Sequence, residues 1–148
     1  MPQAINEFVD LMVESAALWR QHLGHRIRET GLSQAQWRVL AHINRSATPL
    51  TQGQLASRIG VEGATLVPLL DRLESDGWVQ RQPHPEDRRC NILVLEAPAL
   101  PVLQQAEAIA DQLRRELLGN VNTKLLQDCI QVFRHIKESV ESLPQQKP

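Results

Sequence analysis

Residues 83–93, PHPEDRRCNIL, hold the most concentrated charge in the chain. Glu86 and Asp87 are followed at once by Arg88 and Arg89. A guanidinium group binds carboxylate or phosphate through paired hydrogen bonds, so two adjacent arginines offer a site for an anionic partner. The alternative is a solvated turn in which the charges neutralise one another.

The pattern on both sides of this segment predicts a β-hairpin. Residues 78–82, WVQRQ, alternate apolar and polar side chains, and residues 91–96, NILVLE, are β-branched and apolar. The charged segment is therefore a hairpin tip, and an arginine there can probe the minor groove of DNA, whose negative potential attracts a guanidinium. Because neighbouring strand residues point to opposite sides, we expect Arg89 to enter the groove and Arg88 to be held by Asp87 or to reach a phosphate.

Three short helices are predicted before the hairpin. The first two begin with capping boxes, in which a hydroxyl residue precedes a glutamine by three positions: Ser33 with Gln36, and Thr51 with Gln54. The second of these helices ends at Gly60, and the third helix, within residues 61–77, ends at Gly77. Short helices joined by tight turns predict a helix-turn-helix.

Long amphipathic helices flank this central module. Apolar residues three or four apart predict helices over residues 5–27, 98–119 and 123–143. The terminal helices have no partner inside the small module, so their apolar faces predict an obligate homodimer with interleaved termini. The expected domains are a helical dimerisation region, residues 1–30 and 98–148, and a winged helix-turn-helix DNA-binding domain, residues 31–97.

Composition excludes several classes of protein. The 148 residues are 42% hydrophobic, enough for one compact domain, or a small domain plus an extended region. No stretch approaches the roughly 18 apolar residues of a membrane span, and no signal peptide is visible, so we expect a cytoplasmic protein. Nucleotide-binding glycine loops, GxSxG and HExxH are absent from the sequence. We therefore expect no enzyme, no cofactor and no metal site.

Two runs of sequence resemble the MarR/SlyA family of bacterial transcriptional regulators, which are dimeric winged helix-turn-helix proteins. The runs are GLSQAQWRVLAHI and the segment from PLTQGQLASRIGVEGATL through LLDRLESDGWVQR to the Asp-Arg-Arg wing. The resemblance covers nearly the whole chain. It implies a mainly α fold with a small β-hairpin wing, in an intertwined homodimer that binds pseudo-palindromic operators. Many relatives release DNA when a small aromatic acid or phenolic ligand binds near the dimer junction.

The resemblance makes residues 62–65 the start of a recognition helix for the major groove. Small residues there allow a close approach, and the preceding helix start can meet a phosphate. The expected DNA-contacting residues are Thr51, Gln52, Gln54, Ala64, Thr65, Arg72, Arg81, Arg88 and Arg89, with Asp87 orienting the wing.

Pro68 departs from the family pattern, because many relatives carry a base-reading arginine at this position. Proline has no donor to give and costs about 3 kcal/mol inside a helix unless a kink or bulge absorbs it. Residues 33–96 contain seven arginines, no lysine and seven acidic residues, so affinity should depend on a few placed arginines. The alternative function is a winged-helix dimer with weakened DNA reading that acts mainly through protein–protein contacts.

Two kinds of regulation are compatible with the sequence. An aromatic carboxylate could bind in a cleft lined by Trp19, His22, His25, Arg26, Trp37 and Arg38, although these tryptophans are equally suited to core packing. Alternatively, Cys90 could sense oxidants, because the guanidinium beside it favours the reactive thiolate. Cys129 lies on an apolar helical stripe and is expected to be inert packing.

Overall fold

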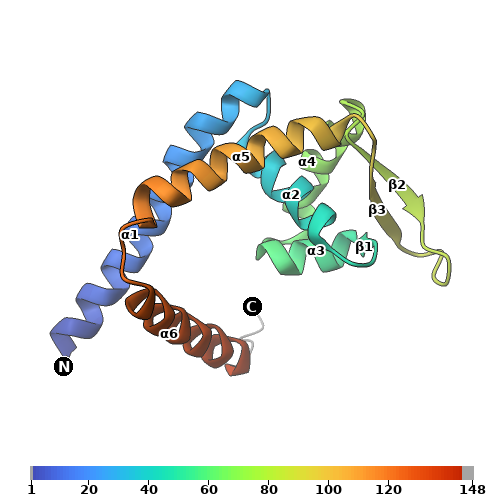
Figure 1. The fold of residues 1–148 in the computed structure, drawn as a ribbon. Helices are drawn as coiled ribbons and strands as arrows, with labels where there is room; N and C mark the ends of the chain where they lie inside the picture. Colours follow the sequence, from blue (N-terminus) through green and yellow to red (C-terminus); the bar gives the residue numbers. More distant parts are fainter. Residues whose placement is uncertain (1, 145–148) are drawn as a thin grey trace. The chain divides into compact units, whose positions relative to one another are not determined.

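The computed structural model describes residues 2–144 and shows a mainly helical chain with one small sheet (Figure 1). The helices are α1 (Pro2–Ile27), α2 (Gln34–Arg45), α3 (Gln52–Ile59), α4 (Gly63–Ser75), α5 (Ala99–Leu118) and α6 (Thr123–Ser142), with a 3-10 turn at Arg28–Thr30. The strands are β1 (Leu50–Thr51), β2 (Val79–Pro83) and β3 (Asn91–Leu95). The described chain forms two compact units, one up to Gln112 and one from Leu113 onwards.

Both predicted capping boxes are confirmed. The Ser33 hydroxyl accepts the Gln36 amide at 3.1 Å, and the Gln36 side chain accepts the Ser33 amide at 2.8 Å. Thr51 and Gln54 form the same pair of bonds, at 3.1 and 2.9 Å. Gly60 ends α3 in the left-handed conformation, at φ 80°, which side chains with a Cβ rarely adopt. These local signals fix where α2 and α3 begin.

The helix-turn-helix core is aliphatic. The largest fully buried side chains of α2, α3 and α4 are Leu40, Leu55, Leu66, Leu70 and Leu73. They recur three or four residues apart within α4, so one face of that helix is buried. The opposite face, which includes Ala64, Thr65 and Pro68, is exposed.

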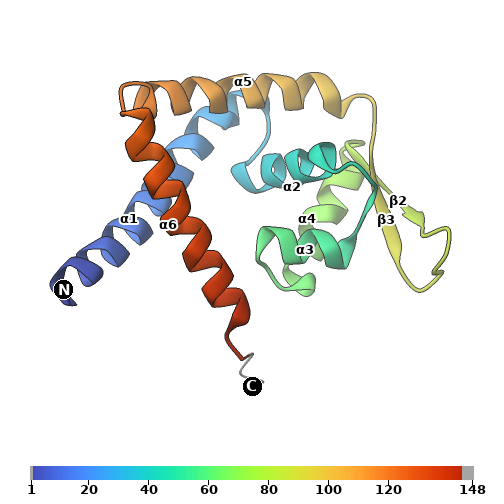
Figure 2. The same ribbon diagram turned by 60° about the horizontal axis from the view of Figure 1, so that its bottom comes forward.

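The sheet is antiparallel with strand order β1-β3-β2. Leu50 of β1 lies opposite Leu93, and Val79 of β2 lies opposite Leu95. The sequence predicted β2 and β3 but missed β1, because two residues are too few to show alternation. In both views the β2–β3 hairpin extends beyond α2, α3 and α4 (Figures 1 and 2).

Helix α4 continues through Pro68 as a single helix to Ser75. Pro68 lies in the second turn and has no amide hydrogen for the Ala64 carbonyl, four residues earlier. Both residues are exposed, so water can satisfy that carbonyl and reduce the cost of the proline. The expected recognition helix is therefore uninterrupted.

The second unit contains the end of α5 and the whole of α6. Asn122 caps α6 by accepting the amides of Lys124 at 2.8 Å and Leu125 at 3.3 Å. Among the described residues, none of α6 is buried, although it carries large apolar side chains with up to 60% exposure. Nowhere in residues 2–144 is a helix long and apolar enough to cross a membrane.

Candidate nucleic-acid interface

The wing tip is a closed turn rather than a continuation of the strands. The Asp87 carbonyl accepts the Cys90 amide at 3.3 Å, and the Cys90 carbonyl accepts the His84 amide at 3.1 Å. Arg88 and Arg89 both lie inside this turn, beyond the ends of β2 and β3. The alternation argument used to choose between them was therefore wrong, since it holds only for strand residues.

Asp87 orients Arg89, not Arg88 as one of the expectations had it. The Asp87 carboxylate accepts Nε of Arg89 at 3.1 Å, Nη2 at 3.3 Å and the Arg89 amide at 3.0 Å. These bonds, the side-chain bonds first, hold the pKa of Asp87 below its ordinary value. The Arg89 side chain is 90% exposed. Because exposed ion pairs are weak, Asp87 aims the guanidinium without preventing it from meeting a phosphate or a groove.

The start of α4 presents small residues to solvent. Gly63, Ala64 and Thr65 are exposed, and Glu62 at the N-cap makes no side-chain cap bond. A Cβ added at Gly63 would meet nothing within 4 Å. Unsatisfied amides and a partial positive charge at a helix N-terminus favour phosphate oxygens. This end of α4 is therefore open to a nucleic-acid backbone.

The capping roles at α3 leave donors available. The Thr51 hydroxyl accepts the Gln54 amide but keeps its own hydrogen, and Gln54 keeps its side-chain NH₂ group. Gln52 is half-buried in the first turn of the same helix. These three residues are placed together at the start of α3, where the sequence analysis expected them.

Arg81 has a different environment from the one expected. Its guanidinium pairs with Asp71 at 2.7 Å and with Glu74 at 2.6 Å, and its side chain is only 18% exposed. Its backbone amide also donates to Glu74 at 3.0 Å. Arg81 therefore fastens β2 to α4, which makes it a positioning residue for the wing and not a candidate DNA contact. Arg72 pairs with Asp76 at 3.2 Å but is 72% exposed, so it stays a candidate.

Replacing Arg81 with methionine is expected to lower the free energy of unfolding by about 1–2 kcal/mol. Charge-assisted hydrogen bonds are lost, but the carboxylates of Asp71 and Glu74 are exposed enough to be rehydrated. The melting temperature should fall by about 3–6 °C. The matched control Arg72→Met, which breaks only an exposed i,i+4 pair, should lower it by less than about 2 °C. Equal shifts in the two variants would contradict the assignment.

The contact between Arg81 and Glu74 also makes the stability of the fold depend on pH. Hydrogen bonds from the Arg81 amide, then from its side chain, hold the pKa of Glu74 below its ordinary value of 4.5. A lowered carboxyl pKa stabilises the fold above about pH 4.5, and that contribution is lost as the pH falls through the folded-state value. Arg81→Met keeps the backbone bond, so the stability difference between this variant and the wild type reports only the side-chain bonds. That difference should be full at about pH 7 and shrink as the pH falls below about 4.5, as thermal melts at a series of pH values would measure.

A cavity of about 410 Å³ lies between α1 and α2. Its lining includes three of the six residues expected at a ligand site: Trp19, Trp37 and Arg38. His22, His25 and Arg26 do not line it. The α1 residues that do are Ala16, Trp19, Arg20 and Leu23, which follow one helical face and end before Arg26. The other lining residues are Gln34, Ala41, His42 and Arg45.

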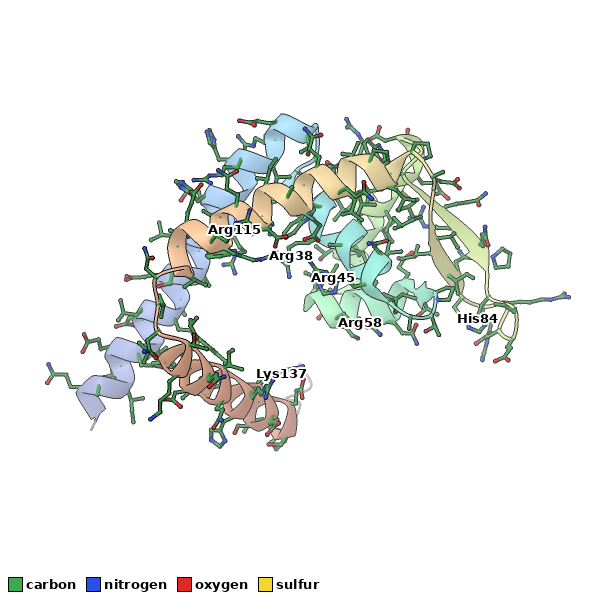
Figure 3. The ribbon with its side chains drawn as sticks, in the orientation of Figure 1. Arg38, Arg45, Arg58, His84, Arg115 and Lys137 are labelled. Carbon is green, nitrogen blue, oxygen red and sulfur yellow. The ribbon has the colours of Figure 1, made fainter. Side chains whose placement is uncertain are left out.

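The cavity is cationic at its α2 side. Arg38, His42 and Arg45 follow one face of α2, and this spacing was the signal in the sequence that could have identified His42 and Arg45. Burial, then the charges of Arg38, Arg45 and Arg58, lower the pKa of His42. Figure 3 shows these three arginines in the same part of the molecule. The Trp37 indole N–H is buried and has no hydrogen-bond partner among residues 2–144.

Arg38 links this cavity to α3 and to the start of α4. Its Nη2 donates to the Ile59 carbonyl at the end of α3, at 3.2 Å. Arg38 also lines a second cavity of about 130 Å³, which reaches Thr65 at the start of α4. Arg38 therefore contacts both the α1–α2 cavity and the end of α3.

The two cysteines differ from each other in their surroundings. Cys90 is half-buried, and its Sγ lies 3.5 Å from the Asp87 carbonyl oxygen. Cys129 is exposed on α6, so the expected packing role requires a second surface against that helix. The described residues contain no group of three or more histidine, cysteine or acidic side chains that could hold a metal ion.

Comparison with known proteins identifies the class. The MarR family model matches residues 30–89. The structure resembles that of the transcriptional regulator PA3341, with 39% identity, a TM-score of 0.85, and 92% of this chain and 99% of that chain covered. The chain belongs to the MarR family and has its winged helix-turn-helix fold; family members are transcriptional regulators, not enzymes.

Two solved structures of relatives contain DNA. One is the M. tuberculosis transcriptional regulator MOSR in complex with DNA, at 26% identity and a TM-score of 0.69, covering 88% of this chain and 96% of that chain. The other is a mutant of MarR from E. coli complexed with operator DNA, at 24% identity and a TM-score of 0.77, with the same coverage of 88% and 96%. At 24% identity, the similarity to MarR from E. coli shows a shared fold alone.

Proposed function

We propose that this protein binds a pseudo-palindromic operator as a homodimer, with α4 in the major groove and the wing in the adjacent minor groove. The observation that carries the proposal is Arg89, whose guanidinium is aimed by Asp87 and 90% exposed at the tip of the hairpin. A narrow minor groove attracts such a group. The open N-terminus of α4 and the donors of Thr51 and Gln54 supply phosphate contacts beside it. The DNA complexes of MOSR and MarR support this use of the fold.

The homodimer follows from the apolar faces of the terminal helices. On α1, the exposed large apolar residues are Ile5, Phe8, Val9, Leu11, Val13 and Leu18. On α6 they are Leu125, Ile130, Val132, Phe133 and Val140, and Leu143 follows at the C-cap. Large apolar side chains exposed in this number along two helices indicate an interaction surface, and a second copy of the chain is the occupant that we propose.

DNA-binding titrations test the function. Fluorescence anisotropy with DNA from upstream of the gene should give a Kd of about 10 nM, roughly 1,000-fold tighter than for random DNA of equal length. The salt dependence should be shallow for a DNA-binding protein, because residues 33–96 are formally neutral. Equal affinity for random DNA and for a library-selected site would contradict the proposal. Recovery of preference in Pro68→Arg would assign that failure to Pro68.

We also infer that the α1–α2 cavity binds a small aromatic carboxylate. Trp19 and Trp37 supply aromatic walls, and Arg38 and Arg45 supply guanidinium groups. A carboxylate there competes with the Ile59 carbonyl for Arg38. This competition loosens the turn between α3 and α4 and so lowers DNA affinity, which requires that the ligand prefer the DNA-free arrangement.

Salicylate and its neutral analogue salicylamide separate this effector site from nonspecific aromatic binding. Salicylate should quench tryptophan fluorescence and weaken operator binding, whereas salicylamide should do neither at equal concentration. Arg38→Gln should bind salicylate about tenfold more weakly, because one charge-assisted contact is worth about 1.4 kcal/mol. Identical responses to the acid and the amide would contradict an anion site.

A further inference from the structure

His84 forms hydrogen bonds that organise the wing tip. Its side-chain Nδ1 lies 3.1 Å from the Glu86 amide and 3.2 Å from the Asp87 amide, and accepts a hydrogen bond from each. Its own backbone amide donates to the Cys90 carbonyl at 3.1 Å. One half-buried residue therefore fixes three backbone positions of the turn. His84 is not among the residues predicted from the sequence, because a lone histidine before a turn has no distinctive spacing.

The contacts connect His84 to the exposed arginine in two steps. His84 holds the backbone of Asp87, and the Asp87 carboxylate holds the Arg89 guanidinium. Figure 3 places His84 in the wing, at the side where β2 ends. Without the imidazole, the Glu86 and Asp87 amides would have to turn to water, and the turn would have several conformations in place of one.

Accepting two N–H groups requires a particular form of histidine. Nδ1 has a free lone pair only in the neutral imidazole that carries its proton on Nε2. A protonated ring presents N–H at Nδ1 and would face two other N–H groups. The neighbouring ionisable groups of the described tip are Glu86, Asp87, Arg88, Arg89 and Cys90, which include both signs of charge. The two hydrogen bonds that order the tip therefore require the neutral His84 imidazole.

We propose that His84 is a positioning residue for DNA recognition, whose neutral imidazole sets the conformation of the wing tip that presents Arg89. The inference rests on the proposed function, since a wing that never meets DNA needs no defined tip. The predicted consequence is a loss of preference for the operator over random DNA when the acceptor is removed. Attraction to any DNA through charge alone would persist.

Three substitutions test the acceptor directly. His84→Asn places its side-chain oxygen where Nδ1 lies, His84→Gln carries its oxygen one bond further, and His84→Ala has no acceptor. At about pH 7.5 the asparagine variant should keep operator affinity within about twofold of the wild type. The alanine and glutamine variants should lose about 5–10-fold, with random-DNA affinity unchanged. Melting temperatures should agree for all four proteins, because the tip lies outside the buried core.

Rescue by asparagine is a readout that a packing role would not move. Asparagine and glutamine have the same amide group, and only asparagine places its oxygen at the Nδ1 position. The ratio of operator to random-DNA affinity should therefore be kept in His84→Asn and fall about 5–10-fold in His84→Gln. An equal fall in these two variants would overturn the proposal, as would wild-type specificity in His84→Ala.

Arg89→Ala in the same assay separates the two levels of inference. If Arg89→Ala loses specificity while His84→Ala keeps it, the wing binds DNA and the inference about His84 is wrong. If Arg89→Ala keeps full specificity, the proposed role of the wing is itself wrong.

Discussion

Arg89→Ala should bind the operator at least about 100-fold more weakly than the wild type, while its affinity for random DNA falls by only about threefold. The guanidinium is aimed by Asp87 and almost fully exposed, so it is organised for its target before DNA arrives. A well-placed arginine in a groove contributes about 1–3 kcal/mol to discrimination, and each homodimer would lose two. Anisotropy titrations with operator and random duplexes at one fixed salt concentration measure both changes.

Arg88→Ala is the matched control for this prediction. It removes the same charge from the same turn, but Asp87 pairs with Arg89 and not with Arg88. We expect a loss of about threefold on both DNAs, as for one phosphate contact. Arg89→Lys keeps the charge without the planar fork and should fall between the two. If Arg88→Ala cost as much specificity as Arg89→Ala, the wing would act as undirected positive charge.

The elements of the fold were predictable because their signals are local. Capping boxes at Ser33 and Thr51 depend on residues three apart, and glycine at position 60 ends a helix through its own conformation. Apolar spacing predicted the helices over residues 5–27, 98–119 and 123–143, which correspond closely to α1, α5 and α6. Strand β1 escaped prediction because its two residues are defined only by pairing with Leu93 and Ile92, more than 40 positions later.

The candidate site was harder to predict because its geometry depends on pairing in space. The charges of residues 86–89 were visible in the sequence, but which arginine Asp87 holds is decided by the turn conformation, and that depends on His84. Arg81 looked like a free cation, yet the register of β2 beside α4 places it between two carboxylates. Which residues line the cavity depends on how α1 and α2 are rotated about their own axes. In the structure, His22 and His25 are not among the lining residues.

Phe133→Glu should abolish dimerisation at micromolar concentration and lower operator affinity by more than about 100-fold. Phe133 is 48% exposed in the single chain, on the same helical face as Cys129 and Val140. In the proposed homodimer this face is buried, and an unpaired carboxylate there costs several kcal/mol. Symmetry places the substitution in the interface twice. Sedimentation velocity measures the association, and anisotropy measures the operator affinity.

Gln131→Glu controls for the added charge. At about 100° per residue, position 131 lies about 200° around the helix from position 133, on the polar face of α6. The Gln131→Glu variant should therefore have the same sedimentation coefficient and the same operator affinity as the wild type. Phe133→Glu that stays a dimer would show that α6 does not form the interface. A monomer should bind more weakly, because a single module cannot reach the second half-site of a palindrome. A monomeric Phe133→Glu that still binds the operator with wild-type affinity would therefore show that one winged helix-turn-helix suffices.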